Sequence, residues 1–205
     1  MQLRAPAILV ASRSHGESAS IARMMTEQYG LVAGYVAGGR GKRMGPVMIP
    51  GNRVEMELRS KSDSQLPFAR LELAESRGPW MTEPLPAAAI TWVCALTATA
   101  VPERNPYPAL YQALEALLGA VCHAPSARGW LPGLLTFEAM LLRELGYGDP
   151  SVAFGSEAGD DLTTSQLESF HRLEAPLSRN LLADRYGDVM AARKLLGDRL
   201  ARMVK

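Results

Sequence analysis

The chain has 205 residues, 47% apolar and 21% charged, which is enough apolar material for the core of one large or two small globular domains. It begins without a signal segment and has no uncharged apolar stretch long enough to span a membrane, so we expect a cytoplasmic protein without membrane contact. The net charge of +1 is unevenly spread, because residues 1–60 and 179–205 are basic and residues 101–178 are acidic. This pattern indicates either two anion-binding surfaces or charges that balance within one fold.

Residues 5–76 have the pattern of short strands separated by glycine-containing turns. Val54, Met56 and Leu58 alternate with charged residues, as in a strand with one buried and one solvated face. The five expected strands are bounded by turn residues and cover 7–10, 21–25, 31–37, 54–58 and 68–73. Five short strands in so few residues predict a small closed barrel of the OB-fold type over residues 1–80.

After a boundary marked by Pro79, Pro84 and Pro86, the spacing of apolar residues changes from that of strands to that of helices. The expected helices cover 86–100, 107–121, 131–145, 163–173, 176–186 and 189–204. The sequence therefore predicts an α+β protein, in which the barrel is followed by an all-α helical bundle domain over residues 81–205.

The densest cluster of like charge is Arg40, Lys42 and Arg43, which lie among glycines between two expected strands. Arginine pairs with phosphate oxygens, lysine acts as a point charge, and glycines let the backbone approach a ligand closely. This loop predicts contact with a nucleic-acid backbone, and the alternative is a solvated hairpin turn. Arg23 and Arg53 would extend the same surface if their strands turn them outward.

Aromatic rings are few in the predicted barrel, and single-stranded nucleic acid binds OB-folds partly by stacking on such rings. Tyr35 is the candidate for stacking. It would share one face of its expected strand with Leu31, however, and that also fits a core position. We expect Phe68 to be buried. With so few rings, affinity should depend mainly on phosphate contacts and fall steeply with salt.

Signals for catalysis are absent from the sequence. His15, His123 and His171 have no metal-ligand spacing, and Gly-x-Ser-x-Gly does not occur. Arg40 follows the glycines of 34–39 where a phosphate-binding loop would need lysine. We therefore expect neither an enzyme nor a cofactor.

Several motifs occur in the same order as in the RecO family. They are Gly16-Glu17-Ser18, the strand end at 26–30, the basic loop at 38–43, the helix end at 137–148 and the segment 192–196. The helix 137–148 follows the basic loop and ends in Leu-Gly-Tyr-Gly, as helices of that family do at this place in the order. The chain resembles that family over most of its length.

Resemblance to RecO implies a DNA repair and recombination mediator of the RecF pathway. Such a protein would bind single- and double-stranded DNA, anneal complementary strands and, with RecR, help to load RecA on DNA coated by single-stranded-DNA-binding protein (SSB). It would be cytoplasmic and nucleoid-associated. The resemblance also implies a pocket for the acidic SSB C-terminal tail, with Arg143, Arg193 and Lys194 as candidate cations, although structural surface charge is their more common role.

The chain departs from the family at one place. Many RecO proteins have a four-cysteine zinc site after the Leu-Gly-Tyr helix, whereas residues 149–156 contain no cysteine here. We therefore expect a member without zinc, whose 149–162 loop is held by packing. Two other functions stay open: an OB-fold module for structured RNA, and an interaction adaptor whose barrel binds no nucleic acid.

Overall fold

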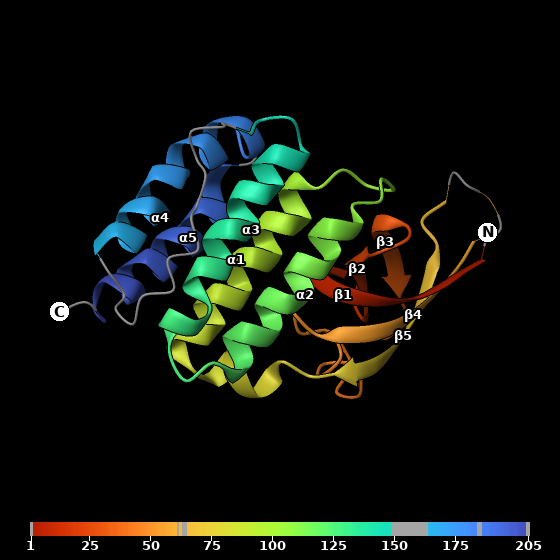
Figure 1. Ribbon diagram of the computed structural model, residues 1–205. Helices are drawn as coiled ribbons and strands as arrows, with labels where there is room; N and C mark the ends of the chain where they lie inside the picture. Colours follow the sequence, from red (N-terminus) through yellow and green to blue (C-terminus); the bar gives the residue numbers. More distant parts are fainter. Residues whose placement is uncertain (1, 61, 63–64, 149–163, 184–185, 204–205) are drawn as a thin grey trace. The chain divides into compact units, whose positions relative to one another are not determined.

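The computed structural model describes residues 2–60, 62, 65–148, 164–183 and 186–203 (Figure 1). The chain forms two compact units. The first, here called the barrel unit, contains Met1–Thr82 and Val101–Tyr111, and the second, the helical unit, contains Glu83–Ala100 and Gln112–Lys205. The proline-rich connector at 101–107 lies in the barrel unit.

The barrel unit is a five-stranded closed barrel in the strand order β1-β2-β3-β5-β4. Its strands are β1 (Gln2–His15), β2 (Ala19–Thr26), β3 (Gly30–Val36), β4 (Arg53–Arg59) and β5 (Phe68–Glu75). All neighbouring pairs are antiparallel except β3 with β5. This arrangement confirms the predicted α+β class with an N-terminal OB-fold barrel.

Alternation along the strands builds the core of the barrel. Val54, Met56 and Leu58 are fully buried, as their period of two predicted, and their side chains meet Leu9 and Met24 from β1 and β2. Further core residues come from the loop between β3 and β4, where Val47 and Met48 are buried in the same cluster.

The barrel closes between β3 and β5 through a single residue pair. Tyr35 is aligned with Phe68, and the Tyr35 N–H donates to the Pro67 carbonyl at 2.8 Å. At the other end of β3 the connector takes the place of a strand, because the Arg104 N–H donates to the Leu31 carbonyl at 2.8 Å.

The connector reaches β3 only because residue 30 is glycine. Gly30 has a φ of +67°, and a Cβ there would lie 2.1 Å from the carbonyl oxygen of Asn105. The Thr26 hydroxyl completes this turn, since it donates to the Gly30 carbonyl at 2.9 Å and accepts from the Tyr29 N–H at 3.0 Å.

The helices are α1 (Pro84–Ala100), α2 (Pro108–His123), α3 (Leu131–Glu144), α4 (Thr164–Pro176) and α5 (Tyr186–Ala201). They belong to the helical unit, except that the first residues of α2, up to Tyr111, belong to the barrel unit. These bounds lie close to those expected, except within the expected helix 176–186, where the described residues 177–181 are not α-helical. A π-helical turn at Leu177–Leu181 follows Pro176 instead. Helix α1 carries no charge and packs against α5, with Trp92 and Leu96 fully buried.

An ion pair lies in the interior of the helical unit. Glu138 of α3 and Arg193 of α5 are 0% and 1% exposed, and the Arg193 Nη2 donates to the Glu138 Oε2 at 2.8 Å. Trp92 Nε1 donates to the Glu138 Oε1 at 2.6 Å, and Arg193 Nη2 also donates to the Phe170 carbonyl at 2.6 Å. The guanidinium carbon of Arg193 lies 3.8 Å from the centre of the Phe170 ring. Four segments of the helical unit therefore meet at one charged pair.

This pair corrects the expectation that Arg193 offers its charge to a partner's tail. The guanidinium is enclosed by Phe170 and Trp92 and bonded to Glu138, so it is not available at the surface. Burial raises the pKa of the Glu138 carboxyl, and the charge of Arg193 opposes that effect. The two residues come from separate family motifs, at 137–148 and 192–196, and their meeting gives both motifs a structural role.

Replacing one member of the pair should destabilise the protein much more than replacing both. Arg193→Met leaves a buried carboxylate without its cation, so we expect a loss of about 3–5 kcal/mol in the free energy of unfolding. Glu138→Leu combined with Arg193→Met removes both charges and should lose clearly less. Urea unfolding of the full chain, followed by circular dichroism at 222 nm, measures the difference.

Arg202→Met is the matched control, because Arg202 is exposed and its replacement should change stability by no more than about 0.5 kcal/mol. A double variant as unstable as Arg193→Met alone would contradict this account of the pair.

Candidate nucleic-acid interface

The basic loop between β3 and β4 folds as a series of tight turns. Gly38 has a φ of +65°, and its carbonyl accepts from the Gly41 N–H at 2.8 Å. The Gly41 carbonyl in turn accepts from the N–H groups of Met44 and Gly45, each at 3.0 Å. These turns hold Lys42 and Arg43 at an exposed tip.

The base of this loop is fixed to the barrel by Asn52. This fully buried side chain donates from Nδ2 to the carbonyls of Pro46 at 2.7 Å and Val47 at 3.1 Å. Its Oδ1 accepts from the Arg77 N–H at 2.7 Å. With Val47 and Met48 in the core, the loop has an anchored base below a charged tip.

Arg40 joins the basic loop to the turn between β1 and β2. Its Nη1 donates to the carbonyls of Glu17 at 3.0 Å and Gly16 at 3.3 Å, and its backbone N–H donates to the Ser18 carbonyl at 3.0 Å. The side chain remains exposed. Because its partners are neutral carbonyls, the positive charge stays at the surface while the two loops are held together.

Next to these loops, three rings form what we call the aromatic cluster, composed of His15, Tyr35 and Phe68. The ring centres of His15 and Tyr35 are 5.8 Å apart, those of Tyr35 and Phe68 are 5.3 Å apart, and both pairs meet edge to face. Tyr35 is half-buried, and Phe68 is 64% exposed. The expectation that Phe68 is buried was therefore wrong, and the surface holds a ring that the sequence analysis assigned to the core.

The aromatic cluster continues into a row of residues across the outside of the barrel. Arg13 is aligned with Ile21, Ile21 with Tyr35, Tyr35 with Phe68, and Phe68 with Arg59. Residues aligned across neighbouring strands share a face, so Arg13 adds an exposed cation that the sequence analysis missed. Arg59 is already engaged, because it donates to Glu57 at 2.7 Å and lowers the pKa of that carboxyl.

Two cations that the sequence predicted for this surface, Arg23 and Arg53, are placed differently from the cations of the basic loop. Arg53 begins β4 opposite Glu75, whereas Phe68 lies opposite Arg59 at the far end of that strand, about 20 Å away at the usual rise per residue. Arg23 lies on the outer face but forms an ion pair with Glu103 at 3.0 Å. The structure thus joins Arg40, in the loop that carries Lys42 and Arg43, to the turn that follows His15 of the aromatic cluster. Arg23 is engaged by Glu103, and Arg53 lies at the other end of its strand.

The expected partner-binding residues of the helical unit also separate. Arg143, in the last turn of α3, is exposed and lies 3.3 Å from the Glu144 carboxylate. Lys194 of α5 is exposed and adjoins the exposed Leu195. Arg193, which precedes Lys194 in the chain, is buried as described above.

Two negative findings apply to the part of the chain that the structure describes. No helix there is both long and apolar enough to cross a bilayer. No group of three or more histidine, cysteine, aspartate or glutamate side chains there is arranged to hold a metal ion. The 149–156 segment, where relatives carry zinc ligands by resemblance, and the rest of the 149–162 loop lie outside the described residues.

Comparison with known proteins gives consistent matches. Residues 1–77 match the family described as "Recombination protein O N terminal", and residues 82–179 match "Recombination protein O C terminal". The chain is 35% identical over 164 residues to the DNA repair protein RecO of Phenylobacterium zucineum, covering 79% of this chain and 66% of the relative. It is 39% identical to the RecO of Rhodospirillum centenum, with 77% and 60% covered, and 38% identical to that of Ruegeria sp., with 79% and 67% covered. The match thus spans about two thirds or slightly less of these relatives' length.

Removing the loop anchor should weaken the fold and loosen the basic tip together. Asn52→Ala leaves the Arg77 N–H and two loop carbonyls without partners, so we expect a loss of about 1–3 kcal/mol in the free energy of unfolding. Amide hydrogen exchange at Met44, Gly45, Val47 and Met48 should accelerate in this variant. Asn105→Ala, at an exposed asparagine, is the control and should leave exchange in the loop unchanged. Unchanged exchange in Asn52→Ala as well would contradict the anchoring role.

Proposed function

The chain belongs to the RecO family of DNA repair proteins, and from this premise we propose that it is a recombination mediator that binds DNA through its barrel unit. In this role it binds single- and double-stranded DNA and anneals complementary strands. It also helps to load RecA on SSB-coated DNA together with RecR. The observation that carries the proposal is the exposed basic tip, Lys42 and Arg43, which Arg40 links to the turn beside the aromatic cluster.

This arrangement supplies the two kinds of contact that a single strand needs. Arg40, Lys42 and Arg43 can pair with successive phosphates, and the loop N–H groups lie beside them. Phe68 offers an exposed ring for a base, Tyr35 holds that ring edge to face, and His15 packs edge to face against Tyr35 in turn. Stacking tolerates every base, so binding of this type does not depend on sequence.

Annealing follows from the same balance of contacts. Two complementary strands repel each other through their phosphates, and cations on one protein reduce that repulsion. Because the surface offers several cations and few rings, it holds DNA mainly by the phosphate backbone. Most base edges then stay free to pair. Duplex DNA can use the same phosphate contacts without the stacking.

The proposed binding of protein partners rests on residues of the helical unit. An acidic tail that ends in an apolar residue needs exposed cations next to apolar surface. Lys194 beside the exposed Leu195 meets this need, and Arg143 adds a further exposed cation on α3. Arg193 acts indirectly, because its bond to Glu138 holds α5 against α3.

Neutralising the loop tip should reduce both affinity and salt dependence. If Lys42 and Arg43 each contact one phosphate, Lys42→Gln with Arg43→Gln should lower the slope of log affinity against log salt by about 1.4 for single-stranded DNA. Fluorescence anisotropy with labelled oligonucleotides across salt concentrations measures the slope, and an RNA competitor tests the preference for DNA.

The matched control is Arg4→Gln with Arg70→Gln, which removes two exposed barrel charges away from the basic loop. An equal change of slope in both double variants would show that only net charge matters and would remove the loop from the interface. Full affinity in the loop variant at low salt would have the same consequence.

Removing the exposed ring should affect single strands selectively. Phe68→Ala loses one stacked base, so single-strand binding should weaken by about 1–3 kcal/mol while duplex binding changes little. Leu73→Ala is the control, since Leu73 is an exposed apolar residue on the same strand. Equal losses for both DNA forms in anisotropy titrations would contradict stacking at this position.

A further inference from the structure

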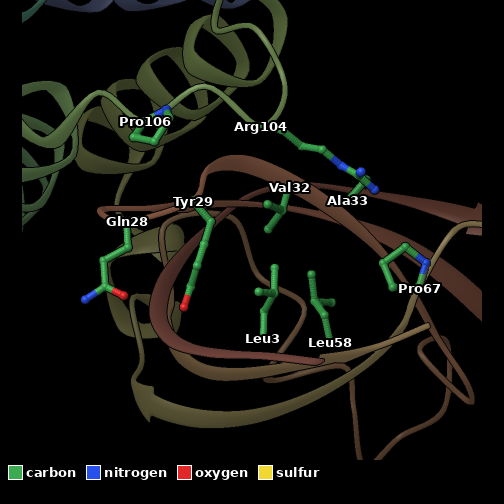
Figure 2. Close-up of a pocket in the computed structure, with 9 residues that line it drawn as sticks. All are labelled: Leu3, Gln28, Tyr29, Val32, Ala33, Leu58, Pro67, Arg104 and Pro106. Atoms are coloured by element: carbon green, nitrogen blue, oxygen red, sulfur yellow. The ribbon is translucent and has the colours of Figure 1, made fainter. Parts of the chain in front are cut away.

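A cavity of about 250 Å³ opens in the wall of the barrel unit (Figure 2). Its floor is formed by Leu3, Val32 and Leu58, which also belong to or pack against the barrel core. Tyr29 and Ala33 lie beside this floor. The volume is below the roughly 300–1,000 Å³ typical of sites for whole small molecules, and suits one large apolar side chain.

The cavity exists because the edge of β3 is only partly covered. At Leu31 this edge bonds to the connector, and at Tyr35 it bonds to the residue before β5. Ala33 lies midway between these two bonds and is aligned with Arg23 of β2 on its other side, and among the described residues no bond joins its backbone to the connector or to β5. Alternate residues of a strand direct their N–H and C=O groups to the same side, so those of Ala33 face the gap.

A cation stands at the rim of the same gap. Arg104 is exposed, and its backbone has a φ of +59°, which is uncommon for a residue with a side chain and is held here by the bond to Leu31. Its guanidinium forms no hydrogen bond or ion pair with the described residues. The adjacent Glu103 does not neutralise it, because Glu103 pairs with Arg23 at 3.0 Å.

These three features match the parts of an extended peptide. An apolar side chain would fill the floor, the peptide N–H and C=O would pair with Ala33, and a neighbouring carboxylate would meet Arg104. Figure 2 shows Arg104, Ala33 and Pro67 on one side of the cavity, above the apolar floor. A nucleobase fits less well, because Leu3, Val32 and Leu58 are apolar and the polar side chains of Gln28, Tyr29 and Arg104 line other parts of the cavity.

We propose that this cavity binds a short, extended, acidic segment of a partner protein through one apolar side chain flanked by carboxylates. The proposal does not depend on DNA binding, because the cavity and the basic loop use different residues. The site adds an interaction surface to the barrel unit.

The test uses the ¹⁵N-labelled full chain and the blocked peptide acetyl-Asp-Glu-Leu-Asp-Glu-amide. Titration should shift the backbone amide signals of Val32, Ala33 and Arg104. Arg104→Glu should weaken binding at least about tenfold, as expected for loss of a hydrogen bond to a charged group. The same peptide with its leucine nitrogen methylated should also bind more weakly, because it has no N–H for the Ala33 carbonyl.

Arg202→Glu is the control for net charge and should leave peptide binding unchanged. The proposal is overturned if the peptide leaves Val32, Ala33 and Arg104 unshifted, or if Arg104→Glu and Arg202→Glu bind it equally. It is also overturned if a thymidine pentanucleotide, rather than the peptide, shifts Val32 and Ala33. Phe68→Ala separates this site from the DNA interface, since it should keep peptide binding even if DNA binding is lost.

Discussion

The closure of the barrel between β3 and β5 is the constraint on which the rest of the barrel unit depends. A barrel must join its first and last edges, and here a single pair, Tyr35 with Phe68, makes the parallel contact. That pair also brings the two rings within 5.3 Å of each other on the outer surface. The same step that completes the fold therefore creates the surface proposed to stack on bases.

The shortness of that closure has a second consequence. Because β5 covers β3 only at Tyr35, another segment must satisfy the remaining edge, and the connector does so at Leu31. Gly30 permits the approach, since any side chain there would collide with Asn105. Ala33, between the two supports, is left with an open edge beside an apolar cavity. A protein that lengthened this pairing would gain ladder hydrogen bonds and lose the cavity.

Sequence patterns predicted the elements well and their long-range partners poorly. Period-two alternation identified β4, and apolar spacing identified α2 and α3, because each pattern depends on neighbours in the chain. The position of Phe68 could have been found in the same way, since it shares parity with Arg70 and Glu72 and not with Leu71. The burial of Arg193 could not, because its partner Glu138 is 55 residues away and arginine is normally exposed. The connector likewise carries no pattern that shows its return to the barrel unit.

The uneven charge of the sequence now has a physical interpretation. The basic N-terminal part keeps its charge at the surface, because Arg40 is bonded only to neutral carbonyls and Lys42 and Arg43 are exposed. The basic C-terminal part differs, since Arg193 is neutralised inside the helical unit by a glutamate from the acidic middle of the chain. A count of charges treats these arginines as equal, although a buried pair adds nothing to the field that attracts DNA. The two anion-binding surfaces suggested by composition therefore reduce to one strong candidate on the barrel, with Lys194 and Arg143 as smaller contributions on the helices.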